Sequence, residues 1–241
     1  MSSTASERPV ALVLEHGRLG PPGILGSWLQ ARDVEAVVHR VEPGVGLPDP
    51  DDFAFVASLG SAKSPRQMDD PLVRAELDLL ATCVDRGIPV LGLCFGGQAL
   101  ATVLGGTVRV LDAPELGWHH VRSAAPEVVT EGPWLQWHYE AFSVPPGAEE
   151  LASSPVCPQA FRHGVHLGTQ FHPESTAEIV KRWAENDQTR LPGRLEDHLV
   201  RLREGDRRHG AAARAAAMRL FDAFWDRAVR PVAPGPLAGR R

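Results

Sequence analysis

The chain is poor in cysteine and has no pattern that would pair the few it contains. It has 241 residues and three cysteines, Cys83, Cys94 and Cys157, none of which lies in a Cys-x-x-Cys pair. An odd number of cysteines at this spacing predicts neither a disulfide framework nor a zinc site. Because unpaired cysteines are typical of a reducing compartment, we expect a cytoplasmic protein that requires no metal or organic cofactor.

An excess of positive charge and long apolar runs are also missing. The formal net charge is −5 and the pI is about 6.1, which excludes the electrostatic signature of a nucleic-acid partner. Residues 1–8 contain no apolar signal core, and no apolar run approaches the ~20 residues that span a bilayer. We therefore expect a soluble, unsecreted protein with small-molecule or protein partners and no membrane contact.

The first part of the chain alternates between apolar runs and helical patterns. Short apolar runs predict strands at 10–14, 35–41, 53–58 and 89–93. Helices are predicted between them, at 24–31 and from Pro71, which follows the capping residue Asp70, to the terminating Gly87. This order predicts an α/β fold with a doubly wound, mostly parallel central sheet flanked by helices.

The second part begins with strand patterns and ends with helical ones. Strand candidates at 107–111, 118–122, 160–162 and 166–171 predict antiparallel strands at the edge of the sheet. Three apolar stripes with helical spacing follow, at 179–183, 195–202 and 213–228. We predict a single domain over residues 1–230 and a disordered tail at 231–241, which is rich in proline and glycine.

Cys94 has the surroundings of a reactive thiol. It follows the apolar run 89–91 and precedes the helical stretch 98–104, with Gly92 and Gly96 two positions away on either side. Small residues at those positions permit a tight turn from strand to helix that presents a nucleophile to a cleft. The nearby helix N-terminus would stabilise a thiolate. The alternative is a buried core cysteine, which is common within strands.

A thiol nucleophile needs a base, and the segment Gln170–Glu174 offers one. His172 ends a strand candidate, and Pro173 breaks the pattern so that His172 and Glu174 can point from one turn into a cleft. Histidine would accept and return the proton, and the carboxylate would orient the imidazole. Taken alone, His172 could equally be an ordinary surface residue before a turn.

Together the two segments resemble the class I glutamine amidotransferase family. The resemblance extends to the first strand, the glycine loop after the third strand, and the segments 115–118 and 137–140. The chain is similar to stand-alone amidotransferases that are like the glutaminase domain of GMP synthase. The resemblance implies a flavodoxin-like doubly wound sheet with antiparallel edge strands.

The resemblance also implies a set of catalytic residues. Cys94 corresponds to the nucleophile, His172 to the general base and later acid, and Glu174 to the carboxylate that orients His172. The backbone N–H groups of Gly60 and Phe95 correspond to the oxyanion hole. Ser61 follows Gly60 where relatives usually have a second glycine, so the loop could close differently and change the rate.

Four further residues correspond to positions that contact glutamine in the family. Gln98 matches a substrate contact, although a polar residue on an early helical turn needs no such role. His138, Tyr139 and Glu140 match a segment that lines the glutamine pocket, and an acidic group suits the substrate ammonium. For Glu140 a solvated turn between strands is an equal alternative.

Other histidine pairs predict no metal site. His119 with His120, and His163 with His166, lack carboxylate or cysteine partners in the sequence and are expected at the surface. The glycine-rich segment 17–23 lacks the Gly-Lys-Ser/Thr ending of a phosphate-binding loop.

The resemblance implies a cysteine-dependent glutamine amidotransferase that hydrolyses the side-chain amide of glutamine through a γ-glutamyl thioester. No second catalytic domain is recognisable, so ammonia would pass to a separate acceptor synthase. A γ-glutamyl hydrolase or peptidase that acts without a partner is one alternative. A non-catalytic binding or regulatory protein on the same fold is the other.

Overall fold

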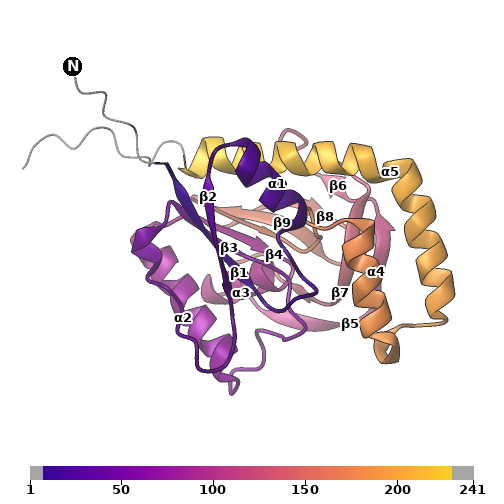
Figure 1. Cartoon of the computed structure of the whole chain (residues 1–241), viewed down its shortest axis with the longest axis horizontal. Coiled ribbons are helices and arrows are strands. Elements are labelled where there is room, and N and C mark those ends of the chain that lie inside the picture. The colour runs from indigo at the N-terminus through magenta and orange to yellow at the C-terminus, as the bar shows by residue number, and fades with distance from the viewer. Residues whose placement is uncertain (1–7, 230–241) are drawn as a thin grey trace, which may run out of the picture.

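A computed structural model describes residues 8–229 of the chain, and the predicted tail at 231–241 lies outside these residues. An eight-stranded sheet with the strand order β2-β1-β3-β4-β10-β9-β8-β6 runs through the molecule (Figure 1). The strands are β1 (Val10–Glu15), β2 (Glu35–Arg40), β3 (Phe55–Ser58), β4 (Val90–Leu93), β6 (Arg122–Ser123), β8 (Glu149–Ser153), β9 (Pro158–His163) and β10 (His166–Thr169). The helices are α1 (Gly23–Ala31), α2 (Pro71–Arg86), α3 (Phe95–Val103), α4 (Ala177–Asn186) and α5 (Leu195–Phe224), with short turns η1 (Pro50–Asp52), η2 (Gln188–Arg190) and η3 (Trp225–Val229).

The sheet has the predicted mostly parallel arrangement with antiparallel strands at one edge. The five strands from β2 to β10 pair in parallel. Strands β9, β8 and β6 then continue the sheet in antiparallel pairing. The predicted α/β fold class is therefore confirmed.

Alternate residues of β1 face two separate cores, as the two-residue period of a strand requires. Val13 belongs to the core that α1 and α5 cover, in which Trp28 packs against Phe221 at a ring-centroid distance of 5.8 Å. Leu12 belongs to the core on the opposite face, beneath α2 and α3. Burial on both faces explains why the central strands appear in the sequence as uninterrupted apolar runs.

Helix α2 begins and ends at the predicted residues. The Asp70 side chain accepts hydrogen bonds from the N–H groups of Leu72 (2.9 Å) and Val73 (3.4 Å), and Pro71 is the first helical residue. Gly87 ends the helix in the left-handed conformation, with φ of 69°.

The segment after α3 differs from the prediction, because it forms a second sheet. Strand β5 (Val108–His119) pairs antiparallel with β7 (Trp134–Phe142), and these two strands stand apart from the main sheet. The predicted strands 107–111 and 118–122 largely fall within the single strand β5, which is irregular between Val110 and Glu115. Strand β7 was not predicted, because its polar and aromatic residues do not alternate cleanly.

The last two predicted helices, at 195–202 and 213–228, are largely the single helix α5. Its apolar pattern is interrupted around Gly205, which lies against Trp118 of β5. A Cβ atom added to Gly205 would lie 2.0 Å from Cδ1 of Trp118. The glycine thus permits close packing and does not end the helix.

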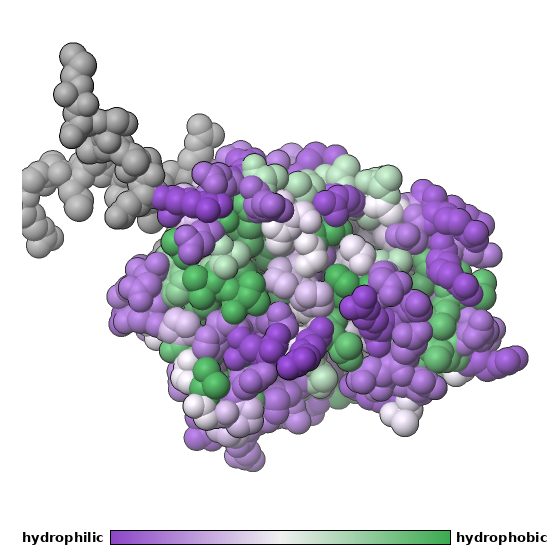
Figure 2. All heavy atoms as spheres, in the orientation of Figure 1, coloured by the Kyte–Doolittle hydropathy of each residue, from purple (hydrophilic) through white to green (hydrophobic). Residues whose placement is uncertain are grey.

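Strand β2 forms one edge of the main sheet and is largely exposed. Figure 2 shows hydrophobic residues gathered over this region, where the side chains of Val37 and Val38 are exposed. Among residues 8–229, no helix has both the length and the apolar content needed to cross a membrane.

Candidate active site

A cavity of about 450 Å³ opens at the carboxyl ends of four parallel strands. The segments that follow β1, β3, β4 and β10 supply His16, Gly60, Cys94 and His172 to its wall. Strand β7 and the α4–η2 segment complete the wall on the other side. Ligands of doubly wound sheets bind at this end of the strands, so the cavity is the candidate active site.

Cys94 forms a sharp turn between β4 and α3. Its φ and ψ are 52° and −104°, a conformation that costs a non-glycine residue about 1–3 kcal/mol. Its two glycine neighbours allow the turn: a Cβ on Gly92 would lie 2.5 Å from the Gly96 oxygen, and one on Gly96 would lie 2.1 Å from the Ser58 oxygen. The spacing of the glycines thus reflects close backbone packing, and it holds Cys94 at the cavity.

The buried side chains of His172 and Glu174 form a pair at the same cavity. His172 Nδ1 lies 2.7 Å from Glu174 Oε1, and both side chains are 3% exposed. Ser175 Oγ donates to the same carboxylate oxygen at 3.3 Å. Trp183 of α4 packs on the His172 ring at a centroid distance of 4.7 Å. The imidazole is therefore held from two sides.

The pKa of His172 lies well above its ordinary value. Burial lowers this pKa, but the charges of Cys94 and Glu174 and hydrogen bonds to both residues raise it by more. A protonated imidazole beside Cys94 stabilises negative charge on its sulfur, which is the state that a nucleophilic thiol requires.

Gly60 lies against both of these side chains. A Cβ atom at Gly60 would lie 2.8 Å from His172 Cε1 and 3.9 Å from Cys94 Cβ. Phe95, the other residue expected to supply an oxyanion-hole donor, is the first residue of α3, so its N–H has no acceptor within the helix. The structure therefore brings the predicted oxyanion residues to the turn that carries Cys94.

Gln98 lines the cavity and also links α3 to neighbouring strands. Its side-chain Nε2 donates to the Glu140 backbone oxygen at 3.0 Å and to Gln170 Oε1 at 3.3 Å. Gln170 Nε2 in turn lies 3.8 Å from Cys94 Sγ. Both interpretations of Gln98, a structural polar residue and a cavity residue, are thus compatible with its position.

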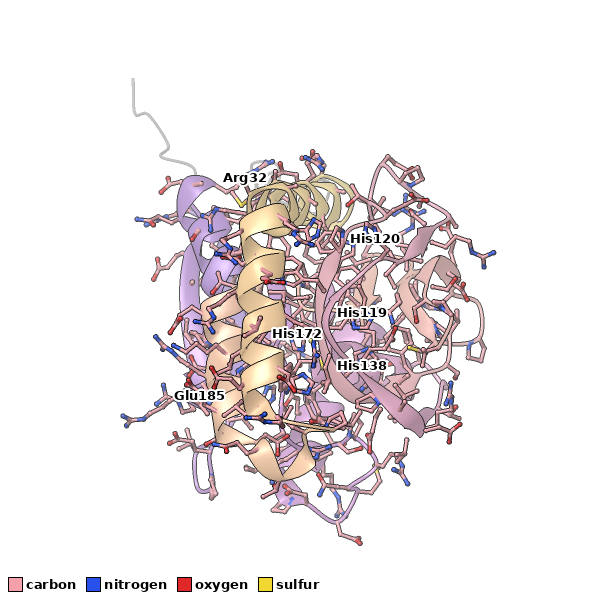
Figure 3. All side chains as sticks on the ribbon, turned by 90° about the vertical axis from the view of Figure 1, so that its right-hand side faces the viewer. Arg32, His119, His120, His138, His172 and Glu185 are labelled. Atoms are coloured by element: carbon pink, nitrogen blue, oxygen red, sulfur yellow. The ribbon has the colours of Figure 1, made fainter. Side chains whose placement is uncertain are left out.

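The remaining predicted pocket residues lie together on β7. His138, Tyr139 and Glu140 all line the cavity, so the alternative of a solvated turn for Glu140 is wrong. The Glu140 carboxylate accepts a hydrogen bond from Ser64 Oγ and pairs with Arg66 at 3.2 Å. Figure 3 shows His138 and His172 on the side of the molecule where α4 and α5 lie.

Comparison with known proteins decides the family. Residues 59–187, more than half of the chain, match the family model described as glutamine amidotransferase class-I. The chain belongs to the class-I glutamine amidotransferase family. The matched segment of this amidotransferase contains Gly60, Cys94, His172 and Glu174, and the enzyme class expected from the sequence is thereby confirmed.

Curated relatives of this amidotransferase include glutamine-hydrolysing GMP synthases. The protein from Bordetella parapertussis is 33% identical over 152 residues, which cover 52% of this chain and 28% of the relative. The protein from Alkalilimnicola ehrlichii is 32% identical over 145 residues, covering 47% and 27%. The chain thus spans little more than a quarter of the length of these relatives.

Solved structures match the amidotransferase over nearly its whole length. A glutamine amidotransferase from Methylobacillus flagellatus has a TM-score of 0.80 and 26% identity, covering 97% of this chain and 99% of its own. A glutamine amidotransferase from Thermotoga maritima also has a TM-score of 0.80, with 25% identity and coverage of 90% and 98%.

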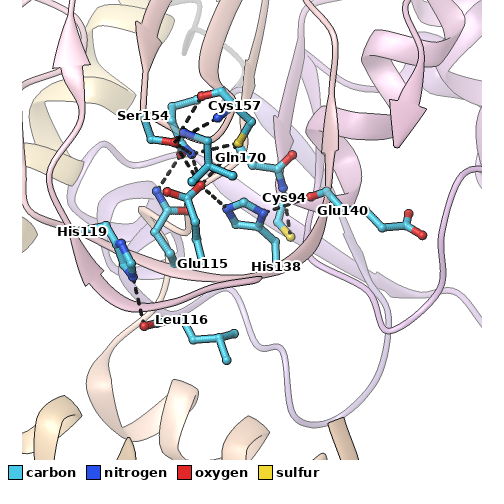
Figure 4. Close-up of polar contacts among 12 residues, drawn as sticks. Cys94, Glu115, Leu116, His119, His138, Glu140, Ser154, Cys157 and Gln170 are labelled. Carbon is cyan, nitrogen blue, oxygen red and sulfur yellow. Dashed lines mark hydrogen bonds and ion pairs between the residues drawn. The ribbon is translucent and has the colours of Figure 1, made fainter. Parts of the chain in front are cut away.

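The amidotransferase also contains a buried polar cluster that the sequence did not predict (Figure 4). Glu115 Oε2 accepts hydrogen bonds from Gln159 Nε2 at 2.7 Å, Ser154 Oγ at 3.2 Å and Cys157 Sγ at 3.4 Å. His138 Nε2 lies 3.3 Å from the same oxygen. Burial and the charge of Glu115 raise the pKa of Cys157 to about 12, so its thiol keeps the proton that it donates.

Glu115, His138 and Cys157 are the residue types that bind zinc, and their ligand atoms lie within 4.8 Å of one another. Their hydrogen bonds already satisfy the carboxylate, so no ion is needed to hold the cluster together. Partial signals of the cluster are present in the sequence, because the 115–118 and 137–140 segments match the family, whereas Cys157 has no flanking motif.

The expectation that all four paired histidines lie at the surface is wrong for His166. Its ring is buried in β10, and burial lowers its pKa to about 4. By contrast, His120 is exposed. Strand β10 is buried along its whole length between β4 and β9, a placement that its four residues alone cannot reveal.

Proposed function

We propose that this amidotransferase hydrolyses the side-chain amide of glutamine through Cys94, His172 and Glu174. The observation that carries the proposal is that a thiol on a strained turn and a buried histidine–carboxylate pair open into one cavity. The Glu174 carboxylate, at 2.7 Å from Nδ1, fixes the imidazole with its Nε2 available for proton transfer.

In the first step, the Cys94 thiolate attacks the side-chain carbonyl carbon of glutamine, and the carbonyl electron pair moves onto the oxygen. The N–H groups of Gly60 and Phe95 would stabilise that oxyanion, and one such donor is typically worth about 10²–10³ in rate. The tetrahedral species then collapses, the C–N bond breaks, and His172 gives its proton to the departing nitrogen. Ammonia and a γ-glutamyl thioester on Cys94 result.

In the second step, water attacks the thioester carbon while His172 takes up one of its protons. The C–S bond breaks, glutamate leaves, and Cys94 returns to the thiolate state beside a protonated His172. The raised pKa of His172 suits this resting state. Solvent water is the single co-reactant that the two steps consume.

The glutamine substrate would lie along β7. Gln98, His138, Tyr139 and Glu140 are placed to contact it, since all four line the cavity. An ammonium group beside Glu140 would share its carboxylate with Ser64 and Arg66, which would place the α-amino end of the substrate at the β3–α2 loop.

We further propose that the ammonia passes to a separate acceptor enzyme. The curated relatives are named GMP synthase, and this chain matches little more than a quarter of their length. A solved structure from Thermoplasma acidophilum, whose description assigns it to one subunit of GMP synthase, shares the fold, with a TM-score of 0.56 and 20% identity. That description supports an arrangement in which glutaminase and synthase are different chains.

The size of the cavity favours one alternative, hydrolysis of larger γ-glutamyl amides without a partner. The cavity of about 450 Å³ lies within the ~300–1,000 Å³ typical of pockets for drug-sized ligands. Its wall includes Arg18, Asp187 and Arg190, and these charged groups could contact a leaving group bulkier than ammonia.

The test is glutamate release by the purified protein from glutamine and from γ-glutamyl dipeptides. Cys94→Ser should abolish release, and Glu174→Gln should lower kcat by at least about 10²-fold while the protein stays folded. Release that survives Cys94→Ser would overturn the mechanism. A preference for dipeptides over glutamine would select the hydrolase alternative.

A further inference from the structure

We propose that His16, paired with Glu76, is a positioning residue that holds the oxyanion loop at Gly60. The inference rests on the proposed function, because it assigns the support of the Gly60 loop in that reaction. His16 directly follows β1 and lines the cavity, and Glu76 lies on α2.

The His16 ring contacts three parts of the site at once. Its Nε2 lies 2.6 Å from Glu76 Oε2, and its Nδ1 lies 3.2 Å from the Gly60 backbone oxygen. The edge of the ring packs on Phe95 at a centroid distance of 4.9 Å. His16 therefore touches both residues whose N–H groups are proposed to bind the oxyanion.

Both hydrogen-bond partners of His16 are acceptors, a carboxylate and a backbone carbonyl. To donate to both, the ring must carry a proton on each nitrogen and is therefore an imidazolium. Burial lowers the pKa of His16, but the charge and hydrogen bond of Glu76, the bond to Gly60 and the charge of Glu15 together raise it above its ordinary value. The ion pair is buried, with side chains 6% and 1% exposed.

Glu76 is itself anchored to the sheet. Its second carboxylate oxygen accepts a hydrogen bond from Ser58 Oγ at 2.6 Å, and the Ser58 backbone oxygen packs against Gly96 of the Cys94 turn. The pair thus connects α2, the end of β3 and the turn that carries the nucleophile. Because every polar atom in this chain of contacts is bonded, its geometry is rigid.

The contact fixes the backbone of the oxyanion loop from both sides of Gly60. Leu59 N–H donates to the Leu14 oxygen at 3.2 Å on one side, and the Gly60 oxygen accepts from His16 on the other. Since peptide groups are planar, these two bonds set the direction of the intervening N–H of Gly60. Ser61, which stands where relatives usually have a second glycine, directly follows this clamp.

The experiment compares two substitutions that each keep one of the two bonds. In His16→Asn the amide nitrogen takes the place of Nδ1 and can still donate to Gly60, whereas in His16→Gln it reaches the place of Nε2 and the Glu76 contact. We expect His16→Gln and Glu76→Gln to lower kcat/KM for glutamine by about 10- to 100-fold, chiefly through kcat, and His16→Asn to retain more activity. The exposed His120→Gln is the matched control and should behave as the wild type.

Two outcomes would overturn the inference while the wild type remains active. One is wild-type kcat in His16→Gln, and the other is a greater loss in His16→Asn than in His16→Gln, which indicates that the Glu76 contact matters merely for folding. Thermal unfolding of each variant separates a folding defect from a change in the site.

Histidine ¹⁵N NMR at pH 7.5 provides a readout that does not depend on activity. The His16 signals, assigned through His16→Asn, should show two protonated nitrogens in the wild type and a neutral ring in Glu76→Gln. A neutral His16 in the wild type contradicts the inference, whatever the activity is. Failure of the wild type to hydrolyse glutamine, together with an imidazolium at His16, would instead overturn the proposed function.

Discussion

Gly60→Ala is expected to damage catalysis far more than folding. A Cβ at this position would lie 2.8 Å from His172 Cε1, which is 0.6 Å short of the 3.4 Å at which ordinary contact begins. Either the imidazole or the loop must move by about that distance. His172 is held by Glu174 and Trp183, and the loop is held by His16, so neither can move without losing a contact.

A displacement near 1 Å at a reacting group typically costs about 10²-fold in rate, equivalent to about 2.7 kcal/mol of transition-state stabilisation. We therefore expect Gly60→Ala to lower kcat/KM for glutamine by about 100-fold. The free energy of unfolding should fall by about 1–3 kcal/mol, the usual range for overpacking.

The assay is glutamate release, measured beside urea unfolding of the same preparations. Gly46→Ala is the matched control, because a Cβ at Gly46 would have no atom within 4 Å and its φ is not in the left-handed region. Gly60→Ala with wild-type kcat/KM would refute the argument that the loop and the imidazole are in fixed contact.

Three further predictions concern stability and metal content. Since burial depresses the pKa of His166 to about 4 from an ordinary ~6.5, the unfolded chain takes up a proton first. The wild type should therefore lose up to roughly 3 kcal/mol of stability between pH 6.5 and 4 relative to His166→Gln, as measured by urea unfolding. Gly205→Ala should lower Tm because its Cβ would meet the Trp118 ring at 2.0 Å, whereas Gly210→Ala, facing the movable end of an Asp206 side chain, should not. Chelation of divalent metals should leave glutaminase activity unchanged, and substantial zinc in the purified protein that is lost in Cys157→Ser would contradict this.

The central strands and the nucleophile turn could be predicted because short segments determine them. Burial on both faces requires continuous apolar residues, as in residues 10–14, and the ends of α2 depend on local capping by Asp70 and Gly87. The turn at Cys94 is equally local, since the glycines that permit it lie two residues away.

The features that could not be predicted depend on residues far apart in the chain. His16 meets Glu76 across 60 positions, and neither residue has a motif around it. The buried cluster of Glu115 likewise joins three strands. Strand β7 was missed because its inner residues are polar and pair with the cavity or with that cluster, so no hydrophobic alternation marks it.

The outer wall of the cavity and its reactive end are encoded in different stretches of the chain. The guanidinium of Arg190, in η2, lies 3.9 Å above the Tyr139 ring, yet it stands beyond residue 187, where the family match ends. Substitutions in η2 can therefore reshape the mouth of the cavity while the Cys94 turn is left intact. A lineage of such proteins can diversify the molecules it admits through this short segment and inherit its bond-breaking residues unchanged.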